Sequence, residues 1–242
     1  MYRASTRSYS LSGQANSIDR LIDAIVALEP SPRTHRWSSI SLCVLDAVWS
    51  IGANYDSVVT PLVHRFAAAY AVPQPLVPIE APLPPESFPL RHLASLDVVE
   101  LLGVTNRQRT STRGGIVKAE AVLRYAQILA SYQVETLDDG MALLSRSKDL
   151  QVVDDALANV PGDGQFGVRR GYLWMLIGDD EKIKPDRMVL RWLSRIGFDV
   201  DPLQAKTLIL DAVARVSGEL GRDVTAWEID HAMWSDARAY GR

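Results

Sequence analysis

The sequence predicts an all-α protein, and three observations lead to this fold class. Apolar residues recur at spacings of three and four in most segments, which is the period of an amphipathic helix. Alternating β-branched runs with hairpin turns, which would indicate strands, are almost absent. The chain has 242 residues, of which 47% are apolar and 23% charged. This balance is typical of a globular protein with a buried core.

The composition also limits the class of protein and its location. No window approaches eighteen uninterrupted apolar residues, so we expect no membrane span. The polar segment 1–14 lacks the apolar core of a secretory signal, and the single cysteine, Cys43, cannot form an internal disulfide. We therefore expect a cytoplasmic protein. The formal net charge of −3 argues weakly against nucleic acid as a partner, although local clusters of charge decide that question.

Helices are expected from the start of the chain. Apolar residues at helical spacing follow Ser17, a good N-cap, and Pro30 ends this first helix. The run 38–53 is apolar on most sides, which predicts a buried helix. A third helix is expected over 56–71. The stretch 73–89 is dense in proline and predicts an irregular connection.

The same periodicity continues through the rest of the chain, and no internal repeat of fixed period interrupts it. Each further segment has the length of an ordinary helix in a globular protein. The expected helices cover 91–102, 116–133, 137–145, 150–159, 166–178, 186–196, 203–219 and 225–239.

One connection carries a candidate binding motif. A helix that ends near Val160 is separated from a helix that begins near Phe166 by little more than Pro-Gly-Asp-Gly, so the two helices must form a hairpin. Gly162 and Gly164 permit positive φ angles and close approach of another backbone. Such a turn opens a helix N-terminus whose free N–H groups attract phosphate, and Arg169 follows one turn later. The alternative is a tight connector without a ligand.

Four segments resemble the helix-hairpin-helix DNA glycosylases, the superfamily of endonuclease III and the adenine-mismatch glycosylase. Residues 160–164 (VPGDG) resemble the family's Leu-Pro-Gly-Val-Gly hairpin, and 184–191 (KPDRMVLR) resemble its Val-Asp-Thr-His-Val-x-Arg segment. Residues 115–120 (GIVKAE) are similar to its Gly-x-x-x-Lys-Ala helix start. Residues 42–59 (LCVLDAVWSIGANYDSVV) resemble its first barrel helix and the following loop. The matches occur in the family's order and span about residues 39–196.

The resemblance implies a fold, a partner and a catalytic residue. It implies two all-α lobes with a cleft between them. Residues 37–180 would form a helical barrel lobe that ends in the hairpin, and residues 1–36 with 181–242 would form the second lobe. Asp186 matches the family's catalytic aspartate. The implied partner is double-stranded DNA, bound by a monomer that needs no cofactor, and the implied location is the nucleoid.

The chemistry of base removal accounts for a single carboxylate. Breaking an N-glycosidic bond creates positive charge on the sugar, and a fixed carboxylate near C1′ stabilises that charge and orients or deprotonates water. Asp186 follows Pro185 at a helix start, where a simple capping role is the alternative. The target base must leave the stack and enter a pocket. Asn54, Tyr55 and Tyr172 are the candidates for that pocket or for a wedge.

Basic residues form the candidate DNA contacts. The polar loop 105–115 holds three arginines and no acid, so it either clamps phosphates or is a solvated loop. The other candidates lie around the hairpin and the two neighbouring matches. The full set is Arg107, Arg109, Arg113, Lys118, Gly162, Gly164, Gln165, Arg169 and Lys184.

The departures from the family restrict the reaction. Bifunctional members carry a lysine just after the hairpin, where this chain has Gln165 and Phe166. Water is therefore the expected nucleophile, with Lys184 as the alternative amine. The iron–sulfur motif of endonuclease III needs four cysteines, whereas this chain has only Cys43. The four histidines do not show the spacing of metal ligands, so no metal is expected.

Three functional hypotheses remain at this point. The first is a monofunctional base-excision glycosylase. The second is a catalytically inactive DNA-binding protein of the same fold, and the third is an unrelated α-helical interaction protein. The sequence does not indicate which base is removed, because the residues of a pocket come from distant segments.

Overall fold

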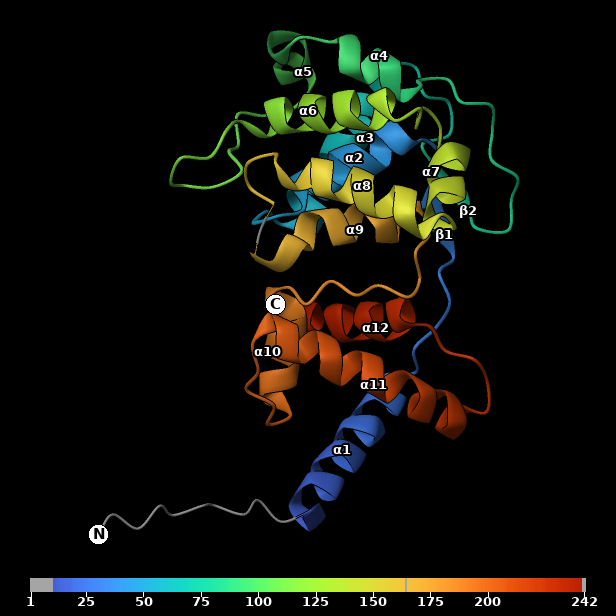
Figure 1. Ribbon diagram of the computed structural model, residues 1–242, viewed down its shortest axis with the longest axis vertical. Coiled ribbons are helices and arrows are strands. Elements are labelled where there is room, and N and C mark those ends of the chain that lie inside the picture. Colours follow the sequence, from blue (N-terminus) through green and yellow to red (C-terminus); the bar gives the residue numbers. More distant parts are fainter. Residues whose placement is uncertain (1–10, 164, 241–242) are drawn as a thin grey trace. The chain divides into compact units, whose positions relative to one another are not determined.

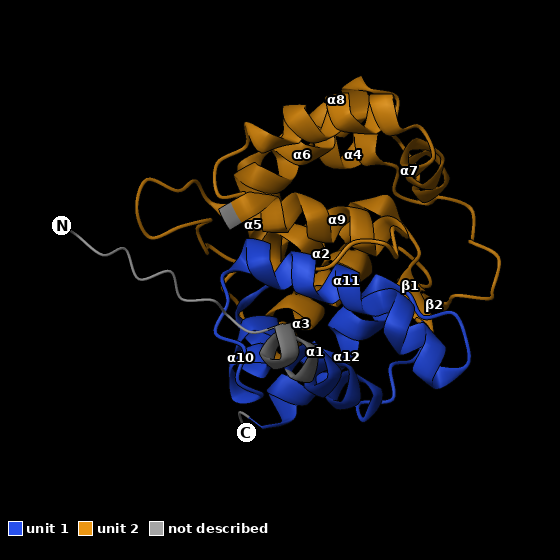
Figure 2. Ribbon diagram, turned by 60° about the horizontal axis from the view of Figure 1, so that its bottom comes forward, with its two compact units in different colours: residues 1–32, 185–242 blue, residues 33–184 orange. Residues whose placement is uncertain are grey.

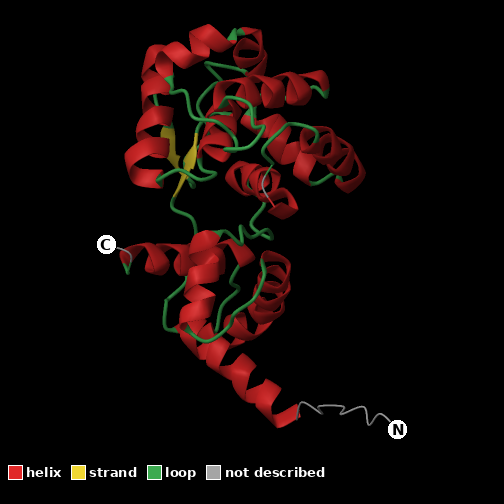
Figure 3. Ribbon diagram, turned by 90° about the vertical axis from the view of Figure 1, so that its left-hand side faces the viewer, coloured by secondary structure: helices red, strands yellow, loops and turns green. Residues whose placement is uncertain are grey.

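The computed structural model describes residues 11–163 and 165–240 and confirms a predominantly helical fold (Figures 1 and 3). Within these residues there are twelve α-helices and one sheet of two short strands. No helix in the described part of the chain combines the length and apolar character needed to cross a membrane.

The chain divides into two compact units (Figure 2). The central unit is the continuous segment Arg33–Lys184, and the terminal unit combines Met1–Pro32 with Pro185–Arg242. The two boundaries of the central unit lie four residues outside the expected limits of 37 and 180.

Helix α2 (Ile40–Trp49) is the centre of the central unit. All ten of its residues are buried, as its apolar sequence predicts. The Ser39 side chain caps its start by accepting a hydrogen bond from the backbone N–H of Ser41. Helices α3 (Thr60–Ala69), α6 (Lys118–Ser131) and α9 (Val168–Ile177) pack against it.

Two expected helices have a different form in the structure. The third helix begins as a short π-helix, Tyr55–Val59, before α3. The expected helix 91–102 is two helices, α4 (Leu90–Ser95) and α5 (Val98–Val104). Asp97 divides them, because it forms a reciprocal capping box with Glu100 and so starts a new helix. Helices α7 (Leu137–Leu144) and α8 (Ser147–Ala158) complete this unit.

The small sheet was not expected. Strand β1 (His35–Trp37) pairs antiparallel with β2 (Leu76–Pro78), in a register that places Arg36 opposite Val77. A strand of three residues is too short to show the two-residue period of a sheet in sequence. Strand β2 lies in the proline-rich stretch, where proline favours extended backbone without predicting a partner.

The terminal unit contains α1 (Leu11–Val26), α10 (Arg187–Arg195), α11 (Pro202–Leu220) and α12 (Ala226–Ala239). Helix α1 begins six residues before Ser17, so the expected N-cap there is wrong. Helix α12 packs against α10 and α11, and α1 packs against α11. An ion pair of 2.6 Å between Arg215 and Asp19 also joins α11 to α1.

Candidate functional site

The connection between α8 and α9 requires a glycine at position 162. Helix α8 ends at Ala158, and a short 3₁₀ turn, Gln165–Gly167, leads into α9. Gly162 has φ +87°, and a Cβ atom on it would lie 2.1 Å from the Cβ of Thr110. Both the backbone angle and the close contact exclude a larger residue. Gly164 lies outside the described residues, as does the side chain of Gln165.

Arg169 supports this turn from inside. Its side chain is fully buried and donates hydrogen bonds to the carbonyl oxygens of Val160 (2.6 Å) and Pro161 (3.1 Å) and to the hydroxyl of Tyr125 (2.9 Å). Its guanidinium also lies 4.6 Å from the centre of the Tyr125 ring. The expected phosphate contact of Arg169 is therefore corrected to a structural role.

A second arginine fixes the same turn from its other side. Arg170 is ion-paired with Asp163 (2.8 Å) and with Asp154. The backbone N–H of Arg169 donates to the carbonyl of Asp163 (3.0 Å), and the Trp174 indole donates to Asp154 (2.7 Å). These bonds engage both acidic groups near the turn and hold its backbone in one shape.

The arginine loop, residues 105–117, is also anchored at its base. The Trp49 indole donates to the Asn106 side chain (3.0 Å), and the backbone N–H of Thr110 donates to Ile116 (2.9 Å). Arg109 forms a β-bridge with Val117. The contact of Thr110 with Gly162 therefore places this loop against the α8–α9 turn.

The arginines of this loop have different roles. Arg107 and Arg113 are exposed, and neither has an ion-pair partner within residues 11–163 and 165–240. Arg109 donates to the carbonyl of Gly115 and stabilises the loop itself. The exposed, uncompensated charge of the loop thus comes from Arg107 and Arg113.

Lys118 is not a surface cation. It is only 3% exposed, and its Nζ donates to the carbonyl oxygens of Trp49 (2.9 Å) and Ile51 (2.7 Å) at the end of α2. Burial, followed by the charges of Arg169 and Lys184, lowers the pKa of Lys118 to about 8. The expected DNA contact is corrected, because Lys118 satisfies the free carbonyls of a helix C-terminus.

A buried carboxyl group occupies the middle of α2. Asp46 Oδ2 accepts hydrogen bonds from the Trp37 indole and the Tyr55 hydroxyl, both at 2.8 Å. Its other oxygen has no hydrogen-bond partner in the described part of the chain. Burial raises the pKa of Asp46, and the hydrogen bonds from Trp37 and Tyr55 only partly offset this. Asp46 was not among the residues expected in a site; its signal in the sequence is an acid inside an otherwise apolar run.

Lys184 and Tyr172 complete the Asp46 cluster, which we define as Asp46, Trp37, Tyr55, Tyr172 and Lys184. The Lys184 ammonium lies 3.6 Å from the centre of the Tyr172 ring and 3.2 Å from the Ser50 hydroxyl. Lys184 is only 7% exposed, which corrects its expected role as a surface contact to DNA phosphate. Burial and the neighbouring Asp46 raise the pKa of Tyr172 well above its usual value.

The expected pocket residues therefore separate into two groups. Tyr55 and Tyr172 both belong to the Asp46 cluster, and each keeps part of its surface exposed. Asn54 is exposed and accepts a hydrogen bond from the backbone N–H of Ser57 (2.9 Å), which caps the π-helix. The cluster brings together a buried carboxyl group, two phenols and an amine from four segments of the central unit.

Asp186 begins α10 in the terminal unit. Its Oδ1 accepts hydrogen bonds from the backbone N–H groups of Met188 (2.7 Å) and Val189 (3.3 Å), so the capping role is real. The other carboxylate oxygen has no partner among the described residues, and the side chain is partly exposed. One oxygen is therefore fixed by the helix, while the second remains available for chemistry.

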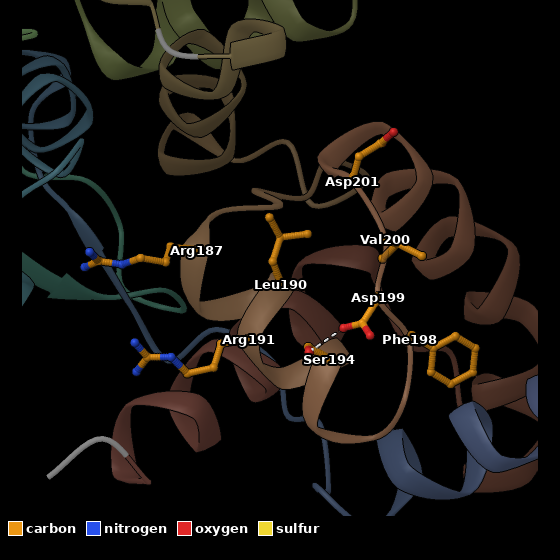
Figure 4. Close-up of a pocket in the computed structure, with 8 residues that line it drawn as sticks. All are labelled: Arg187, Leu190, Arg191, Ser194, Phe198, Asp199, Val200 and Asp201. Carbon is orange, nitrogen blue, oxygen red and sulfur yellow. Dashed lines mark hydrogen bonds between the residues drawn. The ribbon is translucent and has the colours of Figure 1, made fainter.

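Two exposed arginines follow Asp186 on α10. Arg187 and Arg191 extend from the same side of the helix (Figure 4), and neither has an ion-pair partner in the described part of the chain. They border a shallow hollow in the terminal unit. Its other lining residues are Leu190, Ser194, Phe198, Asp199, Val200 and Asp201. No group of three or more His, Cys, Asp or Glu side chains suited to a metal occurs among the described residues.

One protein-family model matches the chain. The family is described as Domain of unknown function (DUF8548), and the match covers residues 16–238. No curated protein and no solved structure matched the sequence. The description of the family specifies no activity.

Proposed function

The chain belongs to the DUF8548 family, and we propose that it is a monofunctional DNA N-glycosylase. The substrate is a damaged or modified base that is flipped out of double-stranded DNA. The catalytic carboxylate is Asp186. The proposal includes the cytoplasmic, nucleoid-associated location expected for a DNA-repair enzyme.

The contact between Thr110 and Gly162 is the observation that carries the DNA-binding part of this proposal. It joins the α8–α9 turn, whose resemblance suggested a phosphate site, to the loop that exposes Arg107 and Arg113. A turn and a basic loop held together by internal hydrogen bonds are preorganised for a charged backbone.

Asp186 supplies the negative charge that the reaction needs. As the bond between C1′ and the base nitrogen breaks, its electron pair leaves with the base and the sugar becomes positively charged. The free oxygen of Asp186 stabilises this charge and accepts a proton from the water that attacks C1′. Arg187 and Arg191, exposed on the same helix, attract the phosphates of the target strand.

The Asp46 cluster contributes two candidate pocket residues. Tyr55 and Tyr172 are the partly exposed members of the cluster and are positioned to contact a base. We assign the two tyrosines as pocket residues, and Asp46, which is fully buried, as the group that holds Tyr55 in place.

The amines of the central unit support hydrolysis rather than attack by lysine. Lys118 is fixed by two backbone carbonyls, and Lys184 lies against the Tyr172 ring and the Ser50 hydroxyl. Both are buried. Water is therefore the proposed nucleophile, and no lysine adduct of the sugar should form.

The deciding experiment is a screen of duplexes that each carry one damaged or modified base, followed by alkali treatment. The expected result is strand cleavage only after alkali, because hydrolysis leaves an abasic site in an intact strand. Binding without cleavage of any duplex would support the inactive DNA-binding alternative. Absence of both binding and cleavage would support an unrelated interaction protein. Borohydride trapping of a covalent adduct would contradict the monofunctional assignment.

A further inference from the structure

Phe166 stands in an unusual position on the α8–α9 turn. Its side chain is 67% exposed, although it is a large apolar ring. Its backbone has φ 59° and ψ 26°, the left-handed conformation that residues other than glycine rarely adopt. Gly167, the next residue, is also left-handed, with φ 72°. The chain thus holds a phenylalanine where glycine would fit with less strain.

The surrounding contacts hold this conformation in place. A Cβ atom on Gly167 would lie 2.6 Å from a guanidinium nitrogen of Arg170, which is itself paired with Asp163 and Asp154. The backbone of Asp163 is bonded to the start of α9. The Phe166 ring is therefore presented to solvent on a braced turn, and strain of this kind often occurs at functional sites.

We propose that Phe166 stacks on a DNA base beside the phosphates bound by the arginine loop. This inference rests on the proposed function and adds a base contact to a turn that was expected to touch only phosphate. An exposed aromatic ring at a basic surface is the usual arrangement for holding an unstacked base, since every base has an aromatic face. The Thr110–Gly162 contact places the arginine loop against the turn that carries this ring.

The chemistry favours a base over an apolar protein partner. A protein-docking surface has an apolar centre made of several side chains, whereas the braced part of this turn is made of Asp163, Arg170 and glycine. Arg107 and Arg113 on the adjoining loop are unpaired cations within the described residues. A polyanion with aromatic bases matches both features.

The test uses the full chain and a duplex that carries an abasic-site analogue beside 2-aminopurine. Binding is followed by anisotropy, and unstacking is followed by 2-aminopurine fluorescence. Phe166→Gly removes the ring and relieves the backbone strain, so its fold should be at least as stable as that of the wild type. Phe166→Leu keeps an apolar side chain without the ring, and Phe166→Trp keeps an aromatic one. Val152→Ala, at a 53% exposed apolar position on α8, is the matched control.

We expect Phe166→Gly and Phe166→Leu to bind roughly 5- to 100-fold more weakly, as is usual for loss of one stacked aromatic. Both should also lose the fluorescence change, while Phe166→Trp and Val152→Ala retain it. Wild-type affinity in Phe166→Leu or Phe166→Gly would overturn the stacking role and leave the proposed function intact. Failure of the wild type to bind DNA would overturn both.

Discussion

At the scale of one residue, the burial of the Asp46 carboxyl group makes the stability of the fold depend on pH. Because burial raises its pKa, the folded state holds this proton more tightly than the unfolded chain does. Its contribution to stability is therefore fully present at low pH and is lost as the pH rises through the raised pKa. Above that pH, a buried charge remains that Trp37, Tyr55, Lys184 and Tyr172 compensate only in part.

The first prediction is that Asp46→Asn gains stability relative to the wild type as the pH rises. An amide accepts the same two hydrogen bonds without a buried charge. Urea unfolding of both proteins at pH 5 and pH 8 checks this prediction. An unchanged stability difference between the two pH values would contradict the raised pKa.

Lys118 carries the opposite dependence on pH. Its pKa in the folded state is lowered to about 8, from 10.5. Between these values the unfolded chain binds the proton and the folded protein does not, so stability from this group rises with pH. We expect the free energy of unfolding of the wild type to rise by at most about 3 kcal/mol across this window. The Lys118→Met variant should show no such rise. The difference between the two unfolding free energies, measured at pH 7.5 and 9.5, tests this prediction; parallel curves would refute it.

Individual residues also show what one sequence can and cannot predict. The need for glycine at 162 was predictable, because a two-glycine turn between helices has few conformations. The burial of Arg169, Lys118 and Lys184 was not. Their partners are backbone carbonyls and a tyrosine ring from distant segments, and a sequence contains no signal for such pairs. The burial of Asp46 had a signal, because this acid lies inside an apolar run, but its partners had none.

At the scale of elements, the α8–α9 turn and the arginine loop form one structure. We predict that Gly162→Ala lowers the free energy of unfolding by about 1–3 kcal/mol, because it combines an unfavourable φ with overlap against Thr110. DNA affinity should fall to a similar extent for all sequences, since the displaced loop contacts phosphate rather than bases. Thr110→Gly in the same chain should recover part of both losses. Independent, additive effects would show that the two segments do not act together.

The loop itself is tested through salt dependence. Replacing both Arg107 and Arg113 with alanine should weaken binding to every duplex and lower the slope of log K against log salt by about 1.8, or 0.9 for each lost phosphate contact. Lys148→Ala is the matched control, because it removes an exposed cation from α8. Titrations at three or more salt concentrations give the slopes. An unchanged slope in the double variant would mean that the loop is merely solvated.

Most elements were predictable, and the exceptions have local causes. The long helices follow from apolar periodicity, which extends over several turns. The break between α4 and α5 depends on one capping box at Asp97, and the strands β1 and β2 depend on pairing between segments about forty residues apart. Short elements held by tertiary contacts leave little periodic signal.

At the scale of the whole molecule, the candidate residues are divided between the two compact units. The central unit holds the Asp46 cluster, the turn and the arginine loop, while Asp186 begins the first helix of the terminal unit after the boundary at Lys184. The resemblance implied such a division from sequence order alone. The chemistry within each unit required side-chain contacts that sequence order does not contain.

The last prediction separates the two roles of Asp186. Asp186→Asn keeps an N-cap of nearly equal quality, so stability and DNA affinity should match the wild type while excision falls by at least about a hundredfold. Asp186→Ala loses the cap as well and should cost about 1 kcal/mol of stability. Single-turnover excision on the reactive duplex, together with thermal unfolding, distinguishes the two variants. If Asp186→Asn excises bases at the wild-type rate, the aspartate is only a helix cap and the catalytic group lies elsewhere. If both variants lose excision and only Asp186→Ala loses stability, the charge on the free oxygen is what the reaction requires.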